Sequence, residues 1–208
     1  MKRFRDFAAV ALCAAVCTAV VFYATRLSPA PLASFSVKID MPEGHGSGSH
    51  IGRGLILTAA HVVDGRKPSI LTDTGIQREA EILWVNKEYD VALLRVSEWS
   101  DIEAIQLECS SLAVGLPVEA YGNPGAINFV HSSGHVVGKS EARGPWRSVV
   151  TLNGTVVMGM SGGALVSRNR VVGVAVGVQV VQAGIFPTIT GFGFAVPGRV
   201  VCDLMGRA

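Results

Sequence analysis

The sequence predicts an all-β sandwich or barrel that is preceded by one apolar segment near the N-terminus. Short runs rich in β-branched residues recur along the chain, and glycine-bearing turns separate them. Apolar residues make up 49% of the 208 residues and charged residues only 16%, a composition that supports a packed core and excludes a disordered chain. Part of the apolar content is concentrated in residues 7–25, which contain no charged side chain.

Residues 7–25 predict a signal anchor that crosses a membrane as a single helix. At about 1.5 Å per residue, a helix of this length matches the roughly 30 Å hydrocarbon core of a bilayer. Lys2, Arg3 and Arg5 precede the segment and Arg26 follows it, so we expect the N-terminus in the cytoplasm and the rest of the chain on the periplasmic or extracellular side. A cleaved signal peptide is the alternative, and it predicts a secreted protein.

The chain is therefore divided into three parts. The signal anchor covers residues 1–27, and a proline-rich linker, which the prolines keep extended, covers residues 28–33. The folded domain is expected over residues 34–208.

Strand-like segments follow one another through the folded part. The segments 55–58, 91–96, 149–152 and 171–176 are short and rich in apolar and β-branched residues, whereas a helical pattern is visible only in residues 196–205. No repeat with a period of about 20 to 50 residues is visible, which excludes propellers and solenoids. The glycine-bearing turns between the segments are residues 52–54, 64–65, 122–125 and 153–154.

Charge and cysteine content limit the function classes further. The net charge is +2 and the Lys and Arg residues are scattered, so the basic surface of a nucleic-acid binder is not expected. Cys109 and Cys202 are the cysteines of the folded part. They would be able to pair in an oxidising compartment, but spacing alone does not establish a disulfide, and two buried thiols is the interpretation that we favour.

Residues 159–163 read Gly-Met-Ser-Gly-Gly and stand between two strand-like segments. As G-x-S-x-G they would suggest an α/β-hydrolase, in which the histidine follows the serine. Here the last histidine is His135, so that interpretation is excluded. As G-x-S-G-G they predict a tight turn in which the amides of Gly159 and Ser161 bind an oxyanion. This second interpretation requires a histidine and then an acid before the serine.

His61 and Asp90 meet that requirement. His61 follows the segment 55–58 and two small alanines, and Asp90 directly precedes the segment 91–96. A carboxylate at such a strand end can be partly buried and can accept the histidine Nδ1–H. Asp64 and Asp101 are weaker candidates, because Asp64 is too close to His61 and no apolar strand follows Asp101. We therefore predict a catalytic triad of His61, Asp90 and Ser161.

The chain resembles the trypsin-like serine peptidases, and among them most closely the HtrA/Deg branch. The resemblance implies two six-stranded β-barrels, the first over about residues 34–115 with His61 and Asp90, the second over about 116–200 with Ser161. The segments that carry the resemblance are 46–51, 55–63, 90–94, 159–165 and 191–197.

Two departures from the branch affect what is carried over. Met160 stands where Asn is usual, and we count its backbone with those of Gly159 and Ser161 in the oxyanion hole. The residues after Pro197 are too few for a PDZ domain, so PDZ-gated activation is not expected. HtrA-like trimers usually rely on an N-terminal aromatic segment, and Phe35 alone gives a homo-oligomer little support.

The resemblance also implies which residues contact the substrate. Residues 153–158 and 174–178 would line the S1 pocket, and they contain no acidic residue, so cleavage after Lys or Arg is disfavoured. The predicted substrate-binding residues are Thr155, Val156, Val176 and Gly177, and they suggest a small or medium apolar P1 residue.

Other conspicuous residues are expected to be structural. His131 and His135 have a helical metal-ligand spacing, but Ser132-Ser133-Gly134 between them favours a turn or strand, so no metal and no cofactor is expected. We also expect His45 and His50 to be partly exposed, and Trp84, Trp99 and Trp146 to pack or anchor loops.

The sequence thus predicts a serine endopeptidase that acts on protein or peptide substrates through an acyl-enzyme. Two alternatives remain at this point. One is a membrane-tethered, catalytically weak, protease-like protein that binds peptides. The other is a viral or phage-type processing protease of the same fold.

Overall fold

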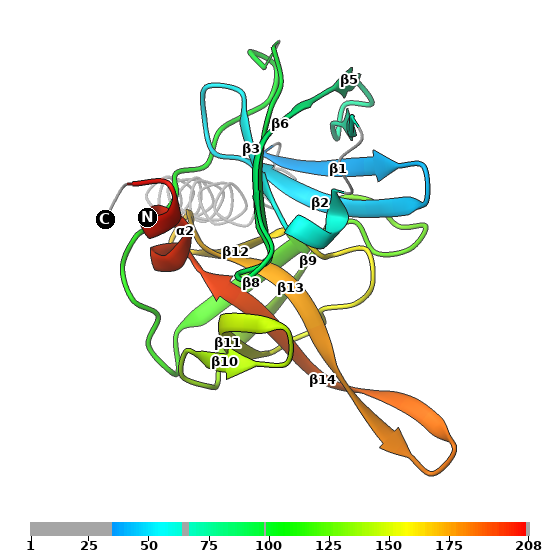
Figure 1. Cartoon of the computed structure of the whole chain (residues 1–208), viewed down its shortest axis with the longest axis vertical. Coiled ribbons are helices and arrows are strands. Elements are labelled where there is room, and N and C mark those ends of the chain that lie inside the picture. The colour runs from blue at the N-terminus through cyan, green and yellow to red at the C-terminus, as the bar shows by residue number, and fades with distance from the viewer. Residues whose placement is uncertain (1–34, 64–66, 98, 207–208) are drawn as a thin grey trace, which may run out of the picture. The chain divides into compact units, whose positions relative to one another are not determined.

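The computed structural model describes residues 35–63, 67–97 and 99–206, which form two antiparallel β-sheets (Figure 1). The predicted signal anchor and linker lie outside these residues. Within the described part, no helix is long and apolar enough to cross a membrane.

The first sheet has seven strands in the order β5-β4-β1-β2-β3-β7-β6. Its edge strands β5 and β6 are consecutive in the chain and are separated only by the buried Ala80, where the chain leaves β4 and begins to pair with β7. The hydrogen-bonded ladder is thus a half-barrel, so the predicted six-stranded barrel is only partly confirmed here. The strands are β1 (Ser36–Met41), β2 (Gly44–His50), β3 (Leu55–Thr58), β4 (Ser69–Leu71), β5 (Gln77–Glu79), β6 (Glu81–Asn86) and β7 (Val91–Arg95).

The second sheet closes into a six-stranded barrel, as the family resemblance implies. Its order is β10-β11-β14-β13-β12-β8-β9, and a further pairing of β11 with β9, at Leu152 and Val136, completes the ring without β10. The strands are β8 (Pro117–Gly122), β9 (Val130–Val136), β10 (Glu141–Arg143), β11 (Trp146–Asn153), β12 (Ala164–Ser167), β13 (Arg170–Ala183) and β14 (Phe186–Pro197). The predicted C-terminal helix is α2 (Gly198–Leu204), and a short 3-10 turn, η1, covers Ala60–Val62.

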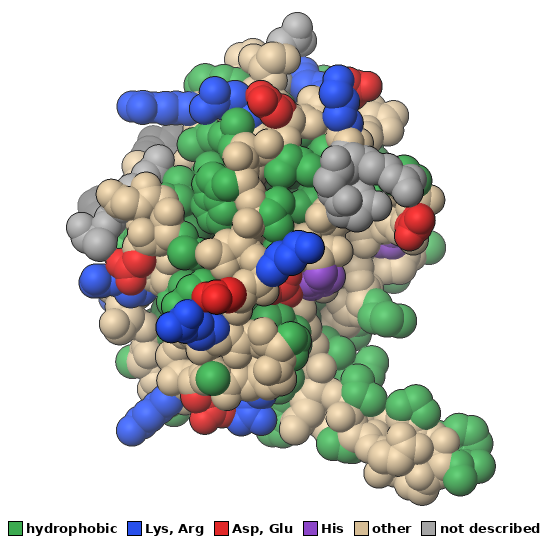
Figure 2. Space-filling view, in the orientation of Figure 1, with side chains coloured by type: hydrophobic (Ala, Val, Ile, Leu, Met, Phe, Trp, Pro, Cys, Tyr) green, Lys and Arg blue, Asp and Glu red, His purple; other side chains and the backbone are tan. Residues whose placement is uncertain are grey.

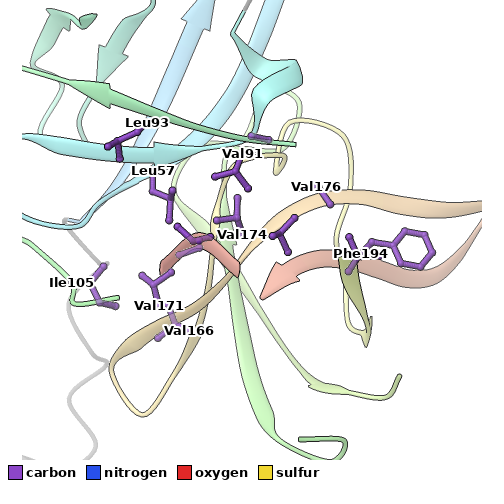
Figure 3. Close-up of a cluster of buried hydrophobic side chains, with 14 of the residues drawn as sticks. Leu57, Val91, Leu93, Ile105, Val166, Val171, Val174, Val176 and Phe194 are labelled. Atoms are coloured by element: carbon purple, nitrogen blue, oxygen red, sulfur yellow. The ribbon is translucent and has the colours of Figure 1, made fainter. Parts of the chain in front are cut away.

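A shared apolar core joins the two sheets (Figure 3). Leu57 and Val91 point into it from the first sheet, and Val174 and Val176 enter it from the second. Each is almost fully buried, and burial of such a side chain contributes about 1.5–3 kcal/mol. Because Asp90 directly precedes Val91, this core holds the strand end that carries the predicted acid against the second barrel.

The β13–β14 hairpin extends beyond the second barrel as an arm (Figures 1 and 2). No charged residue occurs between Arg170 and Arg199, and apolar side chains gather at the tip, where Ile185 is 82% and Phe186 is 68% exposed. The arm therefore presents uncharged strands to solvent.

Cys109 and Cys202 form a disulfide, so the favoured prediction of two buried thiols is wrong. Their Cα atoms lie 5.7 Å apart, within the range that a disulfide bridges. The connection before β8 makes this approach, because the Glu108 N–H donates to the Val171 carbonyl on β13 at 2.8 Å. The bond then attaches this connection to α2.

His50 is fully buried, which corrects the expectation that it is partly exposed. Its Nδ1 lies 3.0 and 2.9 Å from the carbonyl oxygens of Ile102 and Glu103, and its Nε2 accepts the Gly54 N–H at 3.0 Å. The connection between the sheets therefore covers this end of β2, which is why a histidine in a glycine- and serine-rich strand is buried. His45, at the other end of β2, is half-buried.

Candidate active site

His61 and Asp90 are in direct contact. The Asp90 Oδ2 lies 2.7 Å from His61 Nδ1, and Oδ1 accepts the His61 backbone N–H at 2.9 Å. His61 lies on η1 after β3, and Asp90 is the last residue before β7, so the pairing of β3 with β7 brings the two together. With its proton on Nδ1, the imidazole has a lone pair on Nε2 and can act as a base. The His61 side chain is 48% exposed, whereas the Asp90 side chain is only 10% exposed.

The Asp90 carboxylate is kept ionised by its hydrogen bonds. Burial is the largest single influence and raises the pKa of Asp90, but the hydrogen bonds from His61 and Trp146 and the positive charge available to the imidazole outweigh it. The pKa of Asp90 therefore lies below its ordinary value of 3.8. A carboxylate in this state can orient the imidazole and stabilise its protonated form.

Ser161 lies beside the segment that carries His61, although it comes from the β11–β12 connection of the second barrel. Its carbonyl accepts the Ser47 N–H of β2 at 2.8 Å. At the next residue, Gly162 (φ +85°), a β-carbon would lie 2.2 Å from both the Ser47 carbonyl oxygen and Thr58 Oγ1, so only glycine fits. The Ser161 Oγ forms no hydrogen bond to any described residue, so it is not yet engaged with His61.

The turn before Ser161 leaves two amides available. The Met160 N–H donates to the Val157 carbonyl at 3.1 Å and the Gly162 N–H donates to a β13 carbonyl at 2.7 Å. Within the described residues, the amides of Gly159 and Ser161 have no acceptor. The amides of Gly159 and Ser161, two of the predicted oxyanion donors, are thus available to an anion. The Met160 N–H is not, because it is already bonded to Val157, and the Met160 side chain is buried.

A buried polar network supports this turn, and sequence reasoning missed it. The Ser47 hydroxyl donates to the Gly159 carbonyl at 2.7 Å and accepts the Asn123 N–H at 2.8 Å. Both side chains are fully buried, and His45 Nε2 lies 2.9 Å from the Asn123 carbonyl oxygen. The network directs the Gly159 carbonyl toward Ser47. Ser47 lies in the Gly-Ser-Gly run that carries the family resemblance, but nothing in that run indicates its partner.

The predicted substrate-binding residues occupy two places. Val176 lines a cavity of about 440 Å³ together with His61, Asp90 and Trp146. Gly177 follows it and lies against the Trp146 ring. Val156 is buried and faces the bare Cα of Gly193, where a β-carbon would meet its side chain at 2.8 Å. Thr155 is exposed, and its carbonyl accepts the Ser132 hydroxyl.

Trp146 contributes a second feature that the sequence did not indicate. Its indole Nε1–H donates to Asp90 Oδ2 at 2.9 Å, from the first residue of β11. The sequence predicts only packing or loop anchoring for this residue, and a functional partner 56 positions away leaves no local pattern.

The remaining candidates lie elsewhere. His131 and His135 are on β9, and His131 stacks on Tyr121. Asp101 pairs with Arg78 at 2.9 Å, and Asp64 lies outside the described residues. Within the described part of the chain, no group of three or more His, Cys, Asp or Glu side chains is placed to hold a metal ion.

Curated relatives of the chain are bacterial serine proteases. A probable periplasmic serine protease do/HhoA-like of Haemophilus influenzae is 29% identical over 170 residues, covering 78% of this chain and 36% of the relative. The putative serine protease HhoA of Synechocystis is 31% identical over 165 residues, covering 74% and 40%. The periplasmic pH-dependent serine endoprotease DegQ of Escherichia coli is 29% identical. The chain thus spans between a third and two fifths of the length of these relatives.

Solved structures share the fold. The HtrA-type protease AlgW with a tripeptide superposes with a TM-score of 0.72 at 20% identity, over 84% of this chain and 60% of that one. An inactive form of Rv3671c from M. tuberculosis gives 0.70 at 24% identity, over 86% and 91%. Residues 46–174, more than half of the chain, match the trypsin-like peptidase domain. The resemblance inferred from the motifs is confirmed, and the chain belongs to the trypsin-like peptidase family, with relatives in the HtrA/Deg branch.

Proposed function

We propose that this chain is a serine endopeptidase that uses His61, Asp90 and Ser161 as its catalytic triad. The observation that carries the proposal is the contact of His61 Nδ1 with Asp90 Oδ2 at 2.7 Å, beside a turn that presents Ser161. Family membership and serine-protease relatives support the same chemistry. The matched relatives are bacterial, which favours an envelope protease over a viral processing enzyme.

The proposed reaction is acyl transfer to Ser161. His61 Nε2 takes the hydroxyl proton while Oγ attacks the peptide carbonyl, and Asp90 stabilises the imidazolium that forms. His61 then gives the proton to the leaving amine, and a water molecule, deprotonated in the same way, hydrolyses the acyl-enzyme. The free hydroxyl of Ser161 must first bond to His61, a contact that often tightens only when substrate binds.

The oxyanion of the tetrahedral intermediate is assigned to the amides of Gly159 and Ser161. These are the two N–H groups of the turn without an acceptor among the described residues. Fixed donors of this kind stabilise the developing charge, and loss of one typically costs about 3 kcal/mol. The Met160 N–H is assigned no part in this binding, because it is already bonded to Val157.

We assign a small or medium apolar P1 residue to the substrate. Val156 fills the space opposite Gly193, and no acid is present in residues 153–158 or 174–178 to bind a basic side chain. Thr155 and Gly177 remain candidate contacts. A peptide library should show dominant cleavage after residues such as Ala or Val, and dominant cleavage after Arg would overturn this assignment.

We place the protease domain outside the cytoplasm, tethered by the predicted anchor of residues 7–25. The disulfide supports an oxidising compartment, and relatives named periplasmic support the same side of the membrane. Alkaline extraction of membranes from expressing cells tests the tether: an anchored chain stays in the pellet, whereas a cleaved one is released.

Labelling with a fluorophosphonate tests the triad directly. The wild-type chain should be labelled and should cleave peptides, and Ser161→Ala should abolish both. Ser110→Ala is the matched control, because Ser110 is exposed and its hydroxyl has no bond to a described residue. Labelling retained in Ser161→Ala would refute the assignment. Peptide binding without labelling of the wild type would instead support the catalytically weak alternative.

A further inference from the structure

The triad carboxylate is contacted from both sheets. The first sheet supplies His61, whose two N–H groups reach the two oxygens of Asp90. The second sheet supplies Trp146, whose indole N–H donates to Asp90 Oδ2 at 2.9 Å. A donor aimed at a carboxylate forms a charge-assisted bond, which is stronger than a bond between neutral groups. Asp90 is therefore held between the imidazole and the indole.

The start of β11 also binds the residues just before Asp90. The Arg147 N–H donates to the Glu88 carbonyl at 3.0 Å, and the Arg147 guanidinium pairs with the Glu88 carboxylate at 2.9 Å. The same guanidinium lies over the Tyr89 ring, 5.8 Å from its centre. Residues 146–147 thus clasp residues 88–90 through backbone, charge and indole contacts, and we call this set the clasp.

The segment held by the clasp has a backbone that needs support. Asp90 has a φ of +57°, a left-handed conformation that is uncommon for residues other than glycine. Such a conformation persists only where its surroundings enforce it. On the first sheet, the Tyr89 N–H is bonded to Asn86 Oδ1 at 3.1 Å. The clasp adds restraint from the second sheet at the residue where the strain lies.

The second barrel has a space shaped for the indole. A β-carbon on Gly177 would lie 2.5 Å from Trp146 Cη2, so any larger residue at position 177 of β13 would displace the ring. Phe194 on β14 also packs beside the indole, with ring centres 5.6 Å apart. Val176 on β13 lines the same cavity as Asp90, but its side chain is apolar and offers the carboxylate no donor, whereas the indole supplies one.

We propose that Trp146 is a positioning residue of the active site, which fixes the Asp90 carboxylate through the clasp and thereby orients His61. The proposal rests on the proposed function, because it assigns Trp146 a role in the same triad. Trp146 acts through Asp90, and loss of its donor should slow the chemical step rather than weaken substrate binding.

The test compares Trp146→Phe with Trp99→Phe. Phenylalanine keeps an aromatic ring but removes the N–H, and Trp99 lies at a different place, where it contacts His50. For Trp146→Phe we expect kcat to fall about tenfold to a hundredfold with KM within about twofold, which is the size expected when a hydrogen bond to a charged group is lost. Trp99→Phe should leave both constants unchanged.

A spectroscopic measurement separates positioning from general damage. The proton that His61 Nδ1 shares with Asp90 should give a low-field proton resonance in the folded wild type. Trp146→Phe should shift or broaden this resonance, and Trp99→Phe should not. An unchanged kcat and resonance in Trp146→Phe would overturn the proposal. A raised KM at unchanged kcat would also overturn it, because Trp146 would then be a substrate contact.

A second variant loosens the clasp without touching the indole. Arg147→Ala removes the ion pair with Glu88 and should lower kcat by a few fold, whereas Arg199→Ala, which removes the comparable exposed pair with Asp203, should not. These two Arg variants keep the proposal testable if Trp146→Phe does not fold. Equal activities of Arg147→Ala and Arg199→Ala would then refute it. The resonance also reports on the clasp without turnover, so an inactive wild type would refute the proposed function and leave this inference measurable.

Discussion

Removal of the disulfide should destabilise the folded domain by several kcal/mol. The change is Cys109→Ala with Cys202→Ala, which leaves no thiol at a site where Cys202 is fully buried. The bond closes a loop with a sequence separation of 93. In the chain-entropy model a loop of that length constrains the unfolded state by about 4.6 kcal/mol at 25 °C, and for a domain of this size the melting temperature should fall by roughly 10–18 °C.

Urea unfolding at 25 °C measures this effect. The oxidised wild type, the wild type in excess reductant and the double variant are compared, and the last two should agree. Peptide hydrolysis at 20 °C should stay unchanged, because neither cysteine lines the cavity beside His61. A difference below about 1 kcal/mol between oxidised wild type and variant would refute the reasoning. Destabilisation of the variant by reductant would also contradict it, since the variant lacks the bond.

Two further predictions concern the site. Ser47→Ala releases the Gly159 carbonyl and leaves a buried Asn123 N–H without its acceptor. It should therefore lower kcat about tenfold or more and the free energy of unfolding by about 1–3 kcal/mol. Steady-state kinetics and urea unfolding measure the two effects, and an unchanged kcat would contradict the role of Ser47. The pKa of Asp90 is lower in the folded state than its ordinary 3.8, so its contribution to stability is present above that pH and is lost as the pH falls through the folded value. The stability advantage of wild type over Asp90→Asn should therefore shrink between pH 6 and pH 3, and a constant difference in urea unfolding would contradict the assignment.

The three residues of the proposed triad could be predicted from the sequence because each of them stands in a recognisable local pattern. His61 and Asp90 each adjoin an apolar strand, and Ser161 stands in a run of glycines, so the local sequence indicates all three residues. The C-terminal helix was predictable from its local pattern, whereas the second barrel was predicted from the family resemblance. That the first sheet forms only a half-barrel was not predictable, because nothing in the sequence at Ala80 indicates that the chain changes its partner strand there.

What sequence missed is non-local. Ser47 acts on Gly159 from 112 positions away, and Trp146 acts on Asp90 from 56. His50 was misjudged because its strand is rich in glycine and serine, while the residues that bury it, Ile102 and Glu103, lie in a distant connection. The disulfide follows the same rule, since a bond between two cysteines depends on a fold that their spacing does not specify.

Neither sheet holds a complete site, and this division has a physical consequence. The first sheet carries His61 and Asp90, but the clasp that restrains Asp90 comes from β11 of the second. The second sheet carries Ser161, but the hydroxyl that orients the turn before it belongs to Ser47 of the first. Each half therefore supplies a contact that restrains the proposed catalytic residues of the other half. Because the apolar core of Leu57, Val91, Val174 and Val176 joins the same two sheets, the packing that holds the sheets together also holds these contacts in place.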